Sequence, residues 1–179
     1  MSGPVQIVLI IAAIGYVLLR RFTGEPAEAK RMLVLPAVLT VIGLTNLDGV
    51  TGTALLFLVV TALLSIGLGA LRGASVRVYR QDGVVFMRYT WVTLVLWVLN
   101  VAVKFGATLL LGVFDKGAAS ALGNTTMLTI GLGMLVEGVV ALAKALRGGH
   151  QVIWEKGKDG APNRTSPLLD GLRDRIANR

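Results

Sequence analysis

The feature that most constrains this chain is an apolar run of 26 residues, Tyr89 to Phe114, which carries a single charge, Lys104, near its middle. At about 1.5 Å per residue, a helix of this length reaches roughly 39 Å, more than the ~30 Å hydrocarbon core of a bilayer. A central lysine costs about 2.5–3.5 kcal/mol on an insertion scale, whereas each Leu, Ile, Val or Phe returns roughly 0.3–0.6 kcal/mol. We therefore expect this segment to insert into a membrane as a helix.

The composition indicates a small polytopic membrane protein. With 54% hydrophobic residues and a mean hydropathy of +0.72, the chain is too apolar for a soluble domain, and its 179 residues suffice for one membrane bundle. The net charge of +8 does not indicate nucleic-acid binding, because the basic residues lie at the ends of apolar runs, where membrane orientation explains them. We expect the lipid bilayer as a partner and no nucleic acid.

Several kinds of chemical site lack the residues they need. The chain has no cysteine, which excludes disulfides, thiolate catalysis, iron–sulfur clusters and cysteine zinc sites, and His150 is its single histidine. The H-E-x-x-H, P-loop and G-x-S-x-G motifs are also absent. We expect a non-enzymatic protein with no catalytic residues, no metal and no cofactor.

The apolar runs predict an all-α membrane protein, a five-transmembrane-helix bundle within residues 1–147. The predicted helices span approximately residues 4–20, 27–47, 53–72, 89–114 and 118–146. The first run is followed by two arginines and preceded by no basic residue, so we expect an uncleaved anchor with its amino terminus outside. We expect Thr23 to Pro26 to start the second helix, with the proline in its first turn.

A short cytoplasmic β-hairpin is predicted at residues 75–89, because valines and aromatic residues alternate with arginines on both sides of Gln81-Asp82-Gly83. A basic C-terminal tail follows at residues 148–179. Within it, Gln151 to Trp154 is a candidate for an added strand. Residues 166–178 read either as a short amphipathic helix or as a partly ordered tail.

The distribution of basic residues predicts the orientation. Of the 18 Lys and Arg residues, all but Lys104 and Lys116 fall in segments that five spans with an outer amino terminus place in the cytoplasm. Cytoplasmic loops of membrane proteins carry such an excess of positive charge. We expect a multi-pass protein of the bacterial inner membrane with its carboxyl terminus in the cytoplasm.

Small residues on the third predicted helix form a packing face. The residues, at four-residue spacing, are Thr61, Ser65, Gly69 and Gly73. Such a face lets another helix backbone approach closely. We favour packing within the chain, with self-association or another membrane protein as the alternative.

Polar residues also line one stripe on each of the last two predicted helices. On the fourth helix they are Thr90, Thr93, Trp97, Asn100, Lys104 and Thr108, and on the fifth they are Thr126, Thr129, Gly133, Glu137 and Lys144. A tight turn joins the two helices, so we expect them to be antiparallel neighbours. Asn100, Lys104 and Glu137 are then candidates for an ion or proton relay or an anion site. The alternative is a buried pair, or two side chains that extend toward opposite membrane surfaces, without transport.

Part of the chain resembles a known family. Ile66 to Gly73 (IGLGALRG), Arg77 to Gly83 (RVYRQDG) and Arg88-Tyr89-Thr90, followed by Trp97, resemble the CcdC-like family of bacterial membrane proteins over about residues 60–110. The resemblance implies a small multi-helix integral membrane protein without an established activity, and some members are named for neighbouring cytochrome c biogenesis genes. Because the chain lacks cysteine, a thiol relay in cytochrome maturation gains no support.

Two functional hypotheses remain. The first is a non-enzymatic accessory or scaffold protein that packs with membrane partners. The second is a small transporter or channel component that uses Asn100, Lys104 and Glu137.

Overall fold

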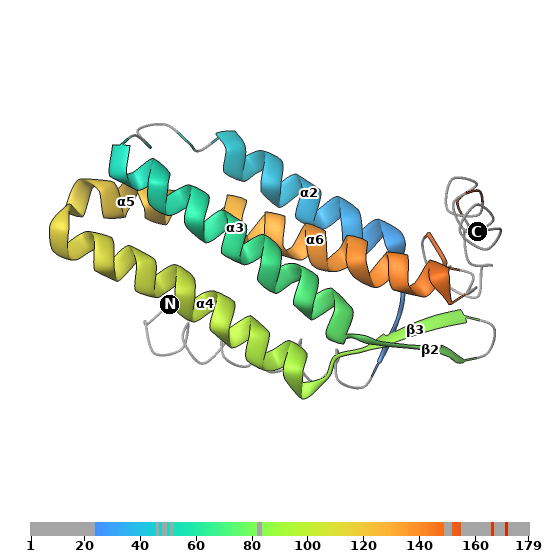
Figure 1. Cartoon of the computed structure of the whole chain (residues 1–179). Helices are drawn as coiled ribbons and strands as arrows, with labels where there is room; N and C mark the ends of the chain where they lie inside the picture. Colours follow the sequence, from blue (N-terminus) through green and yellow to red (C-terminus); the bar gives the residue numbers. More distant parts are fainter. Residues whose placement is uncertain are drawn as a thin grey trace, which may run out of the picture.

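The computed structural model describes residues 24–45, 47, 50, 52–81, 84–148, 152–154, 166 and 171 as a helical bundle with a small sheet at one end (Figure 1). In chain order the elements are β1 (Glu25–Pro26), α2 (Ala29–Thr45), α3 (Gly52–Ser75), β2 (Arg77–Gln81), β3 (Val84–Arg88), α4 (Trp91–Phe114), α5 (Lys116–Asn124) and α6 (Thr126–Arg147). The predicted class, mostly helical with a short antiparallel hairpin, is confirmed. The predicted helix at residues 4–20 lies outside the described residues, as does nearly all of the predicted helix at 166–178.

Helix α6 is the centre of the bundle, packed against α2 on one side and α3 on the other, and α3 in turn packs against α4 (Figure 1). Glycines set these close approaches. A Cβ on Gly138 would lie 2.6 Å from the Met32 carbonyl oxygen of α2, and one on Gly73 would lie 2.6 Å from the Glu137 carbonyl oxygen. The expectation that α4 and the last long helix are direct neighbours is wrong, because α4 packs chiefly against α3 and α5.

Three of the described helices, α3, α4 and α6, are long and apolar enough to cross a membrane. The described residues thus suggest a membrane-embedded protein but do not support five spans. The 17-residue helix α2 is shorter, although apolar side chains are exposed along much of its length. Its exposed large apolar side chains are Val34, Leu35, Val38, Val41, Ile42 and Leu44.

The prediction of a single helix at residues 118–146 is wrong, because the helix is interrupted at Thr125 and forms α5 and α6. Asp115 starts α5 by accepting a hydrogen bond from the Ala118 amide at 2.9 Å. At the other end Thr125 leaves helical geometry, with φ −82° and ψ 6°. Its hydroxyl donates to the Leu122 carbonyl oxygen at 2.7 Å, so the side chain satisfies a carbonyl at the end of α5. The short helix then folds back against α4 and α3.

The hairpin is present as predicted, and a third strand joins it. Strands β2 and β3 pair antiparallel, with Arg77 opposite Arg88 and Tyr79 opposite Phe86. Strand β1 pairs with the other edge of β3, giving the order β1-β3-β2. The prediction that Glu25 and Pro26 start a helix is therefore wrong.

The physical reason for β1 is the backbone pairing available beside β3. The Ala27 amide donates to the Val85 carbonyl oxygen at 2.8 Å, which extends the ladder beyond Pro26, a residue without an N–H. Gly24 precedes the strand with φ +92°, a conformation that favours glycine. Helix α2 then begins at Ala29, once the sheet contact has ended.

The described tail residues contact the start of α2 rather than extend the hairpin. Ile153 forms a parallel bridge with Glu28, and the Ala29 and Lys30 amides donate to the carbonyl oxygens of Ile153 and Trp154, each at 3.1 Å. These bonds satisfy amides at a helix start, which have no partner within the helix. The tail segment thus caps α2, and the strand predicted to join the hairpin pairs elsewhere.

Two apolar clusters close the ends of the bundle. At the sheet end, buried side chains from β3, α2, α6 and the tail pack together: Ala27, Ala29, Val85, Leu142, Ala145, Leu146 and Val152. At the α5 end, a second cluster joins α3, α4, α5 and α6: Ala54, Leu58, Leu111, Ala119, Leu122 and Leu128. The polar side chains of the interior lie at and between these two clusters.

Candidate functional site

An ion pair between α3 and α6 is the most deeply buried charged contact that the structure describes. Arg72 Nε lies 3.2 Å from Glu137 Oε2, and the two side chains are 0% and 9% exposed. The Tyr89 hydroxyl, from the segment between β3 and α4, donates to the other carboxylate oxygen, Oε1. Glu137 therefore joins α3, α6 and the base of the hairpin through one carboxylate. Removing one member of such a pair leaves a buried charge without its counterion.

Trp97 and Gly133 complete the surroundings of the guanidinium. The Arg72 Cζ atom lies 4.7 Å from the centre of the Trp97 ring on α4, a cation–π contact. A Cβ on Gly133 would lie 3.1 Å from Arg72 Nη2, so the absent side chain leaves room for the guanidinium. An arginine, rather than a lysine, fits this place because its planar group can stack on a ring while binding a carboxylate.

Hydroxyl and amide groups join α3 to α4 on either side of this pair. Ser65 Oγ donates to Asn100 Oδ1 at 3.0 Å between buried side chains. Nearer the sheet, the Ser75 and Thr93 hydroxyls lie 2.8 Å apart, and Thr90 caps α4 by accepting from the Thr93 amide at 3.3 Å. Hydrogen bonds between helices hold a bundle together where lipid supplies no hydrophobic driving force.

Lys104 has separate partners, nearer the α5 end of the bundle. Its Nζ donates to the Leu122 carbonyl oxygen at 3.1 Å and to Thr125 Oγ1 at 3.0 Å. Both acceptors lie where α5 ends, so the lysine ties α4 to the break between α5 and α6. Thr125 and Glu137 are 12 residues apart in the chain, which corresponds to roughly 18 Å along α6. Lys104 and Glu137 therefore do not form a pair.

Lys144, the last residue of the predicted stripe on α6, binds the end of α3. Its Nζ donates to the carbonyl oxygens of Ala74 and Val76, each at 2.8 Å. Carbonyls at a helix end have no partner within the helix, and a cation there also interacts favourably with the helix dipole. The contact fixes α6 beside the junction between α3 and β2.

The predicted packing face lies inside the chain. Thr61, Ser65, Gly69 and Gly73 are all buried in α3. A Cβ on Gly69 would collide with the Gly133 carbonyl oxygen of α6, and a Cβ on Gly133 would lie 3.1 Å from the Ser65 carbonyl oxygen. Because α6 covers Gly69 and Gly73, these two positions are not available to a second chain. Asn100, Lys104 and Glu137 are likewise interior, with 5%, 8% and 6% of their surface exposed.

Sequence reasoning assigned Arg72 to a cytoplasmic segment and so missed the ion pair. The available signal was its position on α3, three residues after Gly69 and seven after Ser65, which puts it on the buried face. Thr125 was missed as a ligand of Lys104 for a different reason. It lay inside a stretch interpreted as continuous helix, where a threonine hydroxyl usually bonds its own helix.

No family model matches this chain, and no curated protein or solved structure was found to be similar to it. The resemblance to the CcdC-like family stays a prediction.

Proposed function

We propose that this chain is a non-enzymatic scaffold or accessory protein of the bacterial inner membrane. One observation carries the proposal: the polar side chains inside the bundle are bonded to neighbouring elements and join them. Arg72, Glu137 and Tyr89 connect α3, α6 and the hairpin, while Lys104 connects α4 to the α5–α6 break. These contacts hold the helices to one another and to the base of the small sheet.

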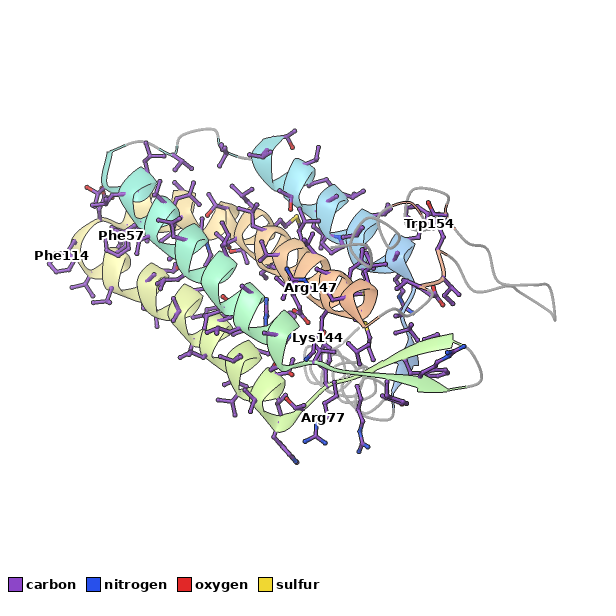
Figure 2. The ribbon with its side chains drawn as sticks, turned by 45° about the vertical axis from the view of Figure 1, so that its right-hand side comes forward. Phe57, Arg77, Phe114, Lys144, Arg147 and Trp154 are labelled. Atoms are coloured by element: carbon purple, nitrogen blue, oxygen red, sulfur yellow. The ribbon has the colours of Figure 1, made fainter. Side chains whose placement is uncertain are left out.

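The charge distribution supports an orientation with the sheet in the cytoplasm. At the sheet end the exposed basic residues of the described chain are Lys30, Arg31, Arg77, Arg80, Arg88, Lys144 and Arg147. At the other end of the described bundle, the exposed basic residue is Lys116. Figure 2 shows Arg77 and Lys144 beside the sheet and Phe57 and Phe114 at the opposite end. The excess of positive charge agrees with a cytoplasmic sheet.

The proposal retains five spans. It counts α2 as a span because this helix packs along α6 and exposes an apolar outer surface, although it is only 17 residues long. A helix of that length corresponds to roughly 26 Å, close to the lower limit for crossing a bilayer. The fifth span is the run at residues 4–20, which lies outside the described residues. With all five, the amino terminus is outside and the carboxyl terminus is in the cytoplasm.

A transporter or channel component is the second candidate. The observation that favours it is that Asn100, Lys104 and Glu137 are all buried within the bundle, where ionisable groups often mark a pathway. Against it, the Lys104 ammonium binds acceptors of the α5–α6 break, and the Glu137 carboxylate binds Arg72 and Tyr89. Two charges committed to different partners do not relay a proton to each other.

Replacing Lys104 with methionine distinguishes the two candidates. We expect the purified protein in liposomes to show no proton or ion flux above that of empty liposomes. The flux measured with Lys104→Met should equal the same background. The variant should also stay folded, because the Leu122 carbonyl oxygen keeps the Thr125 hydroxyl as a donor. The measurement is dye-detected flux under a pH or ion gradient. Flux by the natural protein that Lys104→Met abolishes would establish the transporter instead.

A further inference from the structure

The outer face of the hairpin carries two positively charged side chains directly opposite each other. Arg77 and Arg88 are directly opposite each other on β2 and β3, and both side chains are exposed. Directly opposite residues of an antiparallel pair share a face, with Cβ atoms about 4.5–5.5 Å apart. Val78 and Met87 occupy the other face, where they pack against the buried cluster at the sheet end. The two arginines therefore point away from the bundle, on the same face as Tyr79 and Phe86.

Nothing within the two strands compensates this pair. Like charges directly opposite on a sheet are destabilising, and neither β2 nor β3 contains an acidic residue. The buried Glu137 carboxylate is bound by Arg72 and Tyr89. An anion bound between two guanidinium groups would remove the repulsion. A phosphate fits best, because its oxygens accept two parallel bonds from the planar fork of each arginine.

The position of the pair indicates where that phosphate comes from. Arg77 follows the end of α3 by two residues, and Arg88 precedes the start of α4 by three. At about 3.3 Å per strand residue, both lie within roughly 10 Å of the helix ends, which is the depth of the lipid headgroups. Trp91, the first residue of α4, is 75% exposed at the same end of the helix, and tryptophan is enriched at membrane interfaces. Figure 2 shows Arg77 at the base of the hairpin.

We propose that Arg77 and Arg88 together bind the headgroup phosphate of an anionic phospholipid in the cytoplasmic leaflet. The inference rests on the proposed insertion and orientation, and adds a ligand to them. The bound lipid offsets the repulsion between the strands and holds the hairpin at the membrane surface.

The test compares unfolding midpoints of the purified full chain in nonionic detergent, with phosphatidylglycerol or phosphatidylcholine added. We expect phosphatidylglycerol at about ten times its Kd to raise the midpoint by roughly 3–5 °C. Phosphatidylcholine should raise it much less, because its choline ammonium neutralises the phosphate that both lipids carry. The variant Arg77→Gln/Arg88→Gln should lose most of this rise. Without lipid, the unfolding midpoint of Arg88→Gln should equal or exceed that of the natural protein, because the repulsion between the two arginines is removed.

The control is Arg80→Gln/Arg147→Gln, which removes the same charge from exposed positions at the sheet end but leaves the pair intact. It should keep the rise. An equal loss in both double variants, an equal rise with phosphatidylcholine, or the same rise with inorganic phosphate would each overturn the site. Extraction of the natural protein from membranes by alkaline carbonate would instead overturn the insertion itself, and the flux experiment on Lys104 tests the scaffold separately.

Discussion

Substituting glutamine for Glu137 is expected to lower the free energy of unfolding by about 3–5 kcal/mol, the usual cost of removing one partner from a buried ion pair. Arg72 is fully buried and stays charged, so it would lose its anion in a site that water does not reach. The Tyr89 hydroxyl would also exchange a carboxylate acceptor for a weaker amide. Titration with a denaturing detergent, followed by circular dichroism, measures the loss.

Two controls separate the charge from the packing. Tyr89→Phe removes one hydrogen bond and should cost about 1–2 kcal/mol. The double variant Arg72→Met/Glu137→Leu removes both charges and should be more stable than Glu137→Gln, since apolar replacement of a whole buried pair is often neutral. If the double variant instead loses the sum of the two single losses, the ion pair is not what the Glu137 substitution disrupts.

Replacing Gly69 with leucine is expected to separate α3 from α6 and to prevent the bundle from forming its native contacts. Even a Cβ at this position would collide with the backbone of Gly133, and backbone cannot move aside as a flexible side chain can. Overpacking of a close-packed interface costs about 1–3 kcal/mol and more where rotamers cannot adjust. We expect Gly69→Ala to cost at least 1 kcal/mol in the same detergent titration, and Gly69→Leu to yield little folded protein.

Gly67 supplies the matched control two residues away. A Cβ there would meet nothing within 4 Å, and the residue lies on the exposed side of the same helix. Gly67→Ala should therefore be neutral or stabilising by up to about 1 kcal/mol, because alanine favours helix. Equal effects of alanine at positions 67 and 69 would mean that α3 does not approach α6 through Gly69.

The fold was predictable where a local pattern decides it. Apolar length located α3 and α4, and the alternation around residues 77–88 located the hairpin. The errors arose where distant contacts override the local pattern. Glu25 and Pro26 resemble a helix start but pair with β3, and the run at 118–146 is apolar throughout but breaks at Thr125. Neither the partner strand nor the acceptors for Lys104 can be found from neighbouring residues.

The site was predictable in its composition and not in its pairing. Spacing along single helices identified Asn100, Lys104 and Glu137 as interior. Which groups meet depends on which helices are neighbours, and the expectation that α4 lies beside α6 led to the wrong pair. Because α3 packs against both, its own arginine, Arg72, meets Glu137. A charged residue near a helix end reads equally well as a solvated loop residue, so the ion pair required the structure.

The most direct test of a packed membrane bundle is the labelling of single cysteines by a membrane-impermeant thiol reagent applied from each side. The natural chain has no cysteine, so each introduced residue is the sole target. Ser65→Cys and Thr129→Cys place thiols at positions only 4% and 1% exposed on the inner faces of α3 and α6, without touching the ion pair. Arg80→Cys and Lys116→Cys report the two ends. We predict labelling at Arg80 from the cytoplasm only, at Lys116 from the opposite side only, and at neither inner position from either side. Labelling of Ser65→Cys or Thr129→Cys in the membrane would reveal a water-filled path through the bundle and contradict the account.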